Sequence, residues 1–172
     1  MKFGIMIMPQ HPRSDSPKKR FEECVELTRL ARDAGLDSIA CGQHFLAPPY
    51  QNIQSIPLLS RLAAESGSMS LVLSVILLPL FSPVGVAEDV ASLDVISGGR
   101  VIFGVGLGYR EIEYQGFNTE KKVRIGRFEE ALSLVRRLWV EEGVSHHGQH
   151  FHLDDATCTI RPLQKPHPPI WI

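Results

Sequence analysis

The sequence predicts an α/β protein built around a parallel sheet, and three observations carry this prediction. Segments typical of strands and helices alternate along the 172 residues in the order β-α-β-α-β-α-β-α-β. Repeated right-handed βα units of this kind make neighbouring strands parallel. The strand expected at 70–78 is hydrophobic on both faces, as strands of parallel sheets are. Polar or glycine-rich residues follow several strands directly, which is typical of a ligand-binding sheet edge.

The first half of the chain supplies three strands and two helices. A serine followed by a proline is a favourable helix start, because serine accepts from free N–H groups and proline suits the first helical position. Glycine is a common helix end. The expected elements are a strand at 2–8 closed by Pro9, a helix from Ser16-Pro17 to Gly35, a strand at 38–41, a helix at 56–65 ending near Gly67 and a strand at 70–78.

The second half repeats the same devices. The expected elements are a helix from Ser82-Pro83 to Gly98-Gly99, a strand at 101–105, a helix at 123–142, an irregular extended excursion at 144–161 and the start of a fifth strand at 170–172. Two architectures fit this order, an open doubly wound sheet and a (β/α)8 barrel. A barrel typically needs about 250 residues. Residues 1–172 would therefore form a single domain that makes up roughly half of a barrel.

Composition excludes several classes of function. The net charge is −1 and 22% of the residues are charged, which gives no nucleic-acid footprint. The longest apolar run is 71–81. Spanning a bilayer takes about twice that length, roughly 20 residues, so no membrane partner is expected. The three cysteines, Cys24, Cys41 and Cys158, are an odd and widely spaced set. They indicate reduced thiols in a cytoplasmic protein.

Three chemically suitable features fall at or near strand ends and therefore on one face. They are Gln43-His44 after the second strand, Ser74 within the third, and 106–109 after the fourth. A histidine there can act as acid or base near neutral pH, or hydrogen-bond a cofactor ring. The alternative for His44 is a structural hydrogen bond to a neighbouring backbone group.

Two other motifs give weaker signals. Residues 104–108 resemble a dinucleotide fingerprint, but its last glycine is replaced by Tyr109 and the motif follows the fourth strand. The favoured interpretation is that these glycines let the backbone approach a ligand or turn sharply. The histidine-dense stretch 146–152 matches no zinc spacing, so a solvated loop or hairpin is expected there and no metal site.

With these residues in place, the sequence closely resembles the luciferase-like monooxygenase family over nearly the whole chain. This family comprises flavin- or deazaflavin-dependent (β/α)8 oxidoreductases. The order and spacing of several short motifs carry the resemblance. They are Ala34-Gly35-Leu36-Asp37-Ser38 with Gln43-His44-Phe45, Leu77-Leu78-Pro79 with Ser82-Pro83-Val84, Leu93-Asp94 with Ser97-Gly98-Gly99-Arg100, Phe103 to Tyr109, and Arg161-Pro162 with Pro166 to Trp171.

The resemblance implies a barrel with the cofactor ring over the strand ends. It implies that His44 is the catalytic acid or base and that Ser74-Val75 forms a non-proline cis peptide under the ring. Gln43 stands where many members have Asp or Glu, so a carboxylate role is lost there. The implied cofactor-binding residues are Gln43, Ser74, Val75, Gly106, Leu107, Gly108 and Tyr109.

Two departures bear on the subgroup. Luciferases proper have an arginine for the phosphate where this chain has Leu107, and sugar-phosphate dehydrogenases of the family have a glutamate where it has Tyr109. Both departures argue against those subgroups. The implied cofactor is FMN as reduced flavin, with a deazaflavin coenzyme as the alternative. We expect a homodimer that acts on a small organic substrate, with molecular oxygen as a candidate second substrate.

The resemblance thus predicts the N-terminal half of a flavin-dependent monooxygenase or other oxidoreductase. The second hypothesis is a non-catalytic half-barrel module for binding or assembly that lacks the cofactor-phosphate half. A half-barrel leaves its first and fifth strands as exposed hydrophobic edges, so either form is expected to need a partner. A metal hydrolase, the third hypothesis, would need zinc near His147 and His150.

Overall fold

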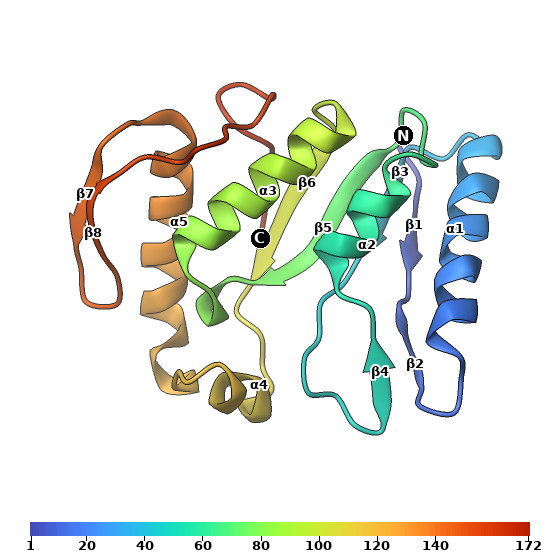
Figure 1. Ribbon diagram of the computed structural model, residues 1–172, viewed down its shortest axis with the longest axis horizontal. Helices are drawn as coiled ribbons and strands as arrows, with labels where there is room; N and C mark the ends of the chain where they lie inside the picture. The colour runs from blue at the N-terminus through green and yellow to red at the C-terminus, as the bar shows by residue number, and fades with distance from the viewer.

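The computed structural model describes residues 1–172, and its centre is a five-stranded sheet in which all neighbouring strands are parallel (Figure 1). The strands are β1 (Gly4–Ile7), β3 (Ser38–Cys41), β5 (Ser70–Leu77), β6 (Val101–Gly106) and β9 (Ile170–Trp171). Their order across the sheet is their order along the chain. A doubly wound sheet reverses its order at a switch point, so this unreversed order is that of a barrel.

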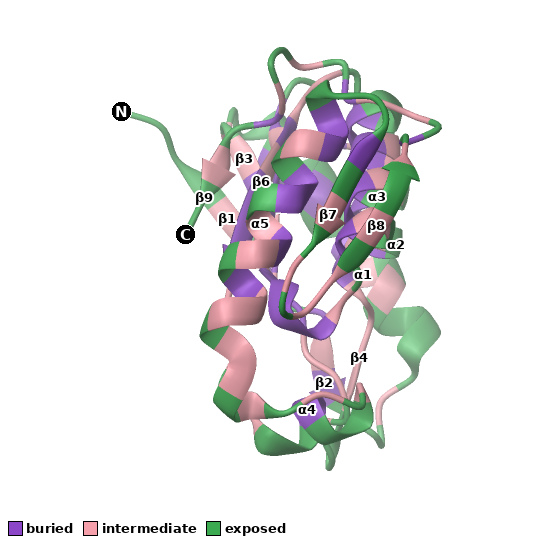
Figure 2. Ribbon diagram, turned by 90° about the vertical axis from the view of Figure 1, so that its left-hand side faces the viewer, coloured by how far each residue is buried: buried purple, intermediate pink, exposed green.

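The hydrophobic core lies between one face of this sheet and the long helices (Figure 2). These helices are α1 (Pro17–Asp33), α2 (Ser55–Leu62), α3 (Pro83–Ser97) and α5 (Arg124–Val140). Ile39, Leu71 and Phe103 are fully buried on the helix side. On the opposite face, Met6 and Trp171 are 44% and 56% exposed. None of the helices combines the length and apolar character needed to cross a bilayer.

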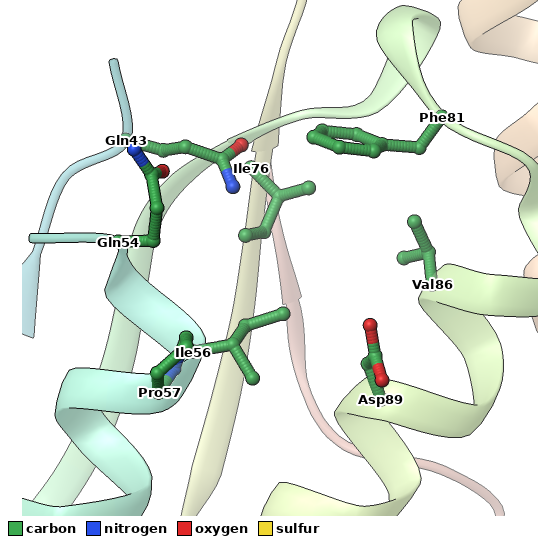
Figure 3. Close-up of a pocket in the computed structure, with 8 residues that line it drawn as sticks. All are labelled: Gln43, Gln54, Ile56, Pro57, Ile76, Phe81, Val86 and Asp89. Atoms are coloured by element: carbon green, nitrogen blue, oxygen red, sulfur yellow. The ribbon is translucent and has the colours of Figure 1, made fainter. Parts of the chain in front are cut away.

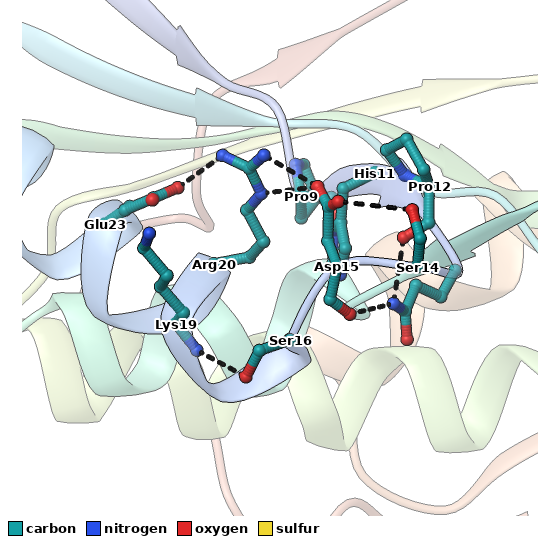
Figure 4. Close-up of polar contacts among 10 residues, drawn as sticks. Pro9, His11, Pro12, Ser14, Asp15, Ser16, Lys19, Arg20 and Glu23 are labelled. Atoms are coloured by element: carbon teal, nitrogen blue, oxygen red, sulfur yellow. Dashed lines mark hydrogen bonds and ion pairs between the residues drawn. The ribbon is translucent and has the colours of Figure 1, made fainter.

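The start of α1 confirms the predicted serine–proline device (Figure 4). The hydroxyl of Ser16 accepts from the amide of Lys19 at 3.3 Å. Arg20 then joins the flanking carboxylates, donating to Asp15 at 2.8 Å and to Glu23 at 2.6 Å. The same serine–proline pair begins α3, where Pro83 occupies the first turn, but the side chain of Ser82 makes no capping hydrogen bond.

Several short elements lie where the sequence predicts only loops. β2 (Gln10–Pro12) pairs antiparallel with β4 (Tyr50–Asn52), and α4 (Glu111–Gly116) forms one short helix after β6. Single 3-10 turns, η1 (Leu78–Leu80) and η2 (Lys121–Val123), complete the connections. Such elements are too short to show a hydrophobic period, which is why the pattern does not reveal them.

The histidine-dense stretch 146–152 belongs to a hairpin, which is one of the two forms, loop or hairpin, expected from the sequence. β7 (Val144–His147) pairs antiparallel with β8 (His152–Ala156). Glu130 of α5 anchors this hairpin, accepting from His146 Nε2 at 2.9 Å and from the amide of Phe151 at 2.8 Å. Burial raises the pKa of Glu130, but these hydrogen bonds outweigh that effect and hold the pKa below its ordinary value. No three metal-ligating side chains come together anywhere in the structure.

Arg100 ties the amino-terminal edge of the sheet to the ends of two helices. Its guanidinium donates to the Ser97 carbonyl at 2.6 Å, to the Met69 carbonyl at 2.6 Å and to the Ala63 carbonyl at 3.0 Å. A further bond reaches the hydroxyl of Ser66 at 2.8 Å. Only the planar, five-donor arginine fork can serve such a set of acceptors at once.

We predict that Arg100→Lys lowers the free energy of unfolding by about 2 kcal/mol or more, because an ammonium group cannot reach all four acceptors. Urea unfolding followed by circular dichroism measures this change. Arg136→Lys, at an exposed position of α5, is the matched control. Its free energy of unfolding should differ from that of the parent by less than about 0.5 kcal/mol. Equal behaviour of the two variants contradicts the structural role of Arg100.

Candidate functional site

A cavity of about 200 Å³ opens at the carboxyl ends of β1 and β3, beside Ser74 within β5. Parallel strands bring these ends to one edge of the sheet. His44 and Ser74, two of the residues singled out in the sequence, both line it. The full lining consists of Met6, Met8, Pro9, Gln10, Gly42, His44, Asn52 and Ser74.

His44 is held through its backbone and its ring. Its carbonyl accepts from Gln54 Nε2 at 2.9 Å and from Asn52 Nδ2 at 3.2 Å. Its Nδ1 lies 3.3 Å from the carboxylate of Glu113, on α4. The ring meets Tyr109 edge to face, with centroids 6.2 Å apart. One third of the His44 side chain stays exposed, so the imidazole is both oriented and accessible.

The Ser74–Val75 peptide bond is cis, as the resemblance implies. The pairing of β5 with β6 shifts here, between Leu73 and Ile76. Ser74 lines the cavity, whereas Val75 packs against the buried cluster that contains Tyr114. The two consecutive residues therefore have different surroundings, and of the pair only Ser74 lines the cavity.

Glycines of β6 make room for this part of β5. A side-chain carbon at Gly104 would overlap the carbonyl oxygen of Leu73, and one at Gly106 would lie 2.8 Å from a methyl group of Val75. The glycine-rich stretch thus permits close approach of two strands. The sequence favours close approach to a ligand or a sharp turn, whereas the approach observed is to a neighbouring strand.

The loop after β6 brings backbone groups and one aromatic side chain close to the cavity. The side chain of Leu107 packs against the core, and its carbonyl accepts from the hydroxyl of Tyr114. Burial raises the pKa of Tyr114, which keeps its hydroxyl protonated as a donor. Gly108 adopts a positive φ of 76°. Tyr109 is 68% exposed and is the side chain of this loop that reaches His44.

Gln43 is not among the residues that line the cavity of His44 and Ser74; Figure 3 shows it in another pocket, beside Gln54 and Ile76. Its amide oxygen accepts from the backbone N–H of Leu77 at 3.1 Å, and its side chain lines a separate cavity between α2 and α3. Gln43 shares a strand face with the fully buried Cys41, and strand alternation therefore explains this placement. The sequence contains this alternation if the predicted strand at 38–41 is extended by two residues.

The structure adds site residues that the sequence patterns miss. Glu113 is 1% exposed and accepts from the amide of Phe45 at 2.9 Å as well as contacting His44. Asn52 and Gln54 hold the backbone of His44 from the segment containing β4. These residues lie in or beside short elements that carry no periodic signal, so spacing alone does not single them out.

Comparison with known proteins gives consistent matches. A family model described as luciferase-like monooxygenase matches residues 1–172. The oxygenase component of flavin-dependent trigonelline monooxygenase from Acinetobacter baylyi is 27% identical over 183 aligned residues, which cover all of this chain and 48% of that protein. An F420-dependent glucose-6-phosphate dehydrogenase from Kribbella flavida is 33% identical over 81% of this chain and 44% of its own.

Among solved structures, the monooxygenase RslO1 from Streptomyces bottropensis is 31% identical, with a TM-score of 0.90 over 99% of this chain and 52% of that one. The FMN complex of the oxygenating constituent of 3,6-diketocamphane monooxygenase from Pseudomonas putida shares the fold at 18% identity, with a TM-score of 0.88 over 99% of this chain and 50% of its own. The chain spans about half the length of the relatives it matches, which fits part of a (β/α)8 barrel.

We predict that Gly104→Ala destabilises the fold, because the added methyl group meets a backbone oxygen that cannot move aside alone. The free energy of unfolding should fall by about 2–3 kcal/mol. Gly85→Ala is the matched control, since it sits within α3 with open space around it. That change should raise stability by about 0.5–1 kcal/mol. Thermal unfolding of both variants measures the difference. Similar values for the two would contradict the close approach of β5 to β6.

Proposed function

Because the chain belongs to the luciferase-like monooxygenase family, we propose that the protein is a flavin-dependent oxidoreductase acting on a small organic substrate with molecular oxygen. One observation carries the proposal. His44 and Ser74 line a single cavity at the carboxyl edge of a parallel sheet, where such folds bind ligands. His44 is the proposed acid or base, and the cavity is the proposed place for the cofactor ring.

The lining residues suit a flat ring with polar edges. Met6 and Met8 provide polarizable apolar surface, which packs well against aromatic rings. Gly42 lets the chain after β3 approach β5 closely, since a side-chain carbon there would lie 3.2 Å from the carbonyl oxygen of Ser74. The Ser74 hydroxyl and the His44 imidazole offer hydrogen bonds. Backbone at 106–108 and the ring of Tyr109 complete the proposed cofactor surface.

A bound flavin or deazaflavin supplies electron or hydride transfer. The chain's own contribution is binding, orientation and the handling of protons. An imidazole is the side chain best suited to accept or donate a proton near neutral pH. The contacts of Gln54 and Glu113 with His44 limit its movement, as a positioned acid or base requires.

We propose FMN as the cofactor and a deazaflavin as the alternative. The trigonelline monooxygenase component, named as flavin-dependent, aligns over the whole of this chain, which supports a flavin cofactor. Relatives named as F420-dependent support the alternative. Tyr109 stands where the sugar-phosphate dehydrogenases have a glutamate, so we do not extend their substrate to this protein.

We also propose a cytoplasmic homodimer. Cys24, Cys41 and Cys158 are buried free thiols, which suits a reducing compartment. Burial raises the pKa of Cys41 to about 12, so that thiol is unreactive.

The dimer is proposed from α1, whose Leu27 and Leu30 are 38% and 59% exposed. Covering them with a second copy would remove apolar surface from water. Light scattering on a sizing column tests the dimer.

We predict that the protein binds FMN and that His44→Ala weakens this binding by up to about tenfold, the value of one lost hydrogen bond. Flavin fluorescence titration under oxidised conditions, and anaerobic titration with reduced FMN, measure the affinity. Coenzyme F420 is titrated in parallel, and the tighter of the two ligands identifies the cofactor.

His147→Ala is the control, because His147 lies on the β7–β8 hairpin, where its side chain is 65% exposed and contacts the exposed Asp154 and the ring of His152. Its affinity should match the parent. If neither FMN nor F420 binds the folded protein, the proposed function fails and the non-catalytic binding module becomes the better hypothesis. If FMN binds equally well to the parent and to His44→Ala, the role given to His44 fails while the cofactor assignment stands.

A further inference from the structure

We propose that Glu113 is a positioning residue that fixes one tautomer of His44, with the proton on Nδ1 and the lone pair of Nε2 turned to the cavity. The catalytic value of this arrangement rests on the proposed function, because it assigns proton transfer to Nε2. The arrangement itself is a property of the folded chain and can be tested without cofactor.

The hydrogen bonds of Glu113 determine which nitrogen carries the proton. One oxygen, Oε1, accepts from the amide of Phe45 at 2.9 Å and lies 3.3 Å from Nδ1 of His44. An ionised carboxylate only accepts, so the nitrogen facing it must be the donor. In a neutral imidazole the other nitrogen is then an acceptor. Glu113 thereby leaves Nε2 as the unprotonated atom of neutral His44.

The surroundings of His44 leave Nε2 available. No protein group hydrogen-bonds this atom, nor is it among the buried polar atoms that lack a partner. The side chain is 33% exposed and borders three adjoining cavities at the sheet edge. The nitrogen opposite Glu113 is therefore accessible, on a side chain that borders the space in which we place the ligand.

Arg110 supports Glu113 from the start of the same helix. Its guanidinium lies 3.6 Å from the Glu113 carboxylate, which is 1% exposed, and a carboxylate so deeply buried needs a compensating charge. The same guanidinium donates to the carbonyls of Phe45 at 3.0 Å and Leu46 at 3.2 Å. Two residues of the α4 region thus hold both the ring of His44 and the backbone just after it.

A purely structural role for Glu113 makes a different prediction. If its function were only to satisfy the Phe45 amide, the His44 ring would be free to populate both tautomers. The position of the proton in neutral His44 separates the two roles. Stability measurements alone do not, because both roles predict that loss of a buried carboxylate partner costs stability.

The experiment is long-range ¹H–¹⁵N correlation NMR of the whole chain labelled with ¹⁵N-histidine, at about pH 9, well above the ordinary imidazole pKa of about 6.5. His44→Gln identifies the His44 signals by their loss. We expect the parent to show His44 as the single Nδ1–H tautomer. Glu113→Met, similar in length but without a carboxylate, should convert this to a mixture containing the Nε2–H form.

Two further variants complete the test. Glu113→Gln keeps an acceptor oxygen of the same reach and should restore the Nδ1–H tautomer. Glu111→Gln, at an exposed position of the same helix, should leave the spectrum unchanged. If Glu113→Met does not fold, the parent spectrum still decides the matter.

An Nε2–H tautomer in the parent, or an unchanged tautomer in folded Glu113→Met, overturns the proposal. Both outcomes are independent of flavin binding, so failure here is distinct from failure of the proposed function.

Discussion

The close approach of β5 to β6 is the constraint on which the site depends. Because Gly104 has no side chain, the carbonyl of Leu73 lies directly against it, and the pairing shifts before it resumes at Ile76. This shift leaves Ser74 in the cavity and Val75 in the packed cluster beside α4. β3 pairs with the other side of β5, so the position of His44 depends on the same geometry. A larger residue in β6 would separate the strands and move both site residues.

Patterns in the sequence predict the frame of this molecule well, for identifiable reasons. Helix starts such as Ser16-Pro17 depend on local chemistry, and the order of the βα units dictates that His44 and Ser74 reach one edge. The remainder depends on contacts between distant segments. The pairing of β2 with β4 joins segments far apart in the chain, and α4 (Glu111–Gly116) is under two turns long. Glu113 is therefore visible only once the chain is folded.

Several residues that carry the family resemblance prove to hold the scaffold together. Asp94 is fully buried and accepts from the side chain of Gln164 at 2.7 Å, which ties α3 to the segment before β9. Arg100 serves the opposite edge from the cavity. By contrast, Leu107 and Tyr109, in the loop after β6, stand where the resemblance implies other residues in two subgroups of the family. The motifs therefore support the fold more strongly than they support a particular reaction.

The methionines of the exposed sheet face have a chemical consequence. Met6 and Met8 are 44% and 67% exposed, and they line the cavity that contains His44. Thioether sulfur is readily oxidised to sulfoxide, which turns an apolar side chain into a polar one. Met8 is the more exposed of the two and is therefore the more accessible to an oxidant. Damage would accumulate in the surface proposed to hold the ring, so a closely seated ligand would protect the wall it rests on.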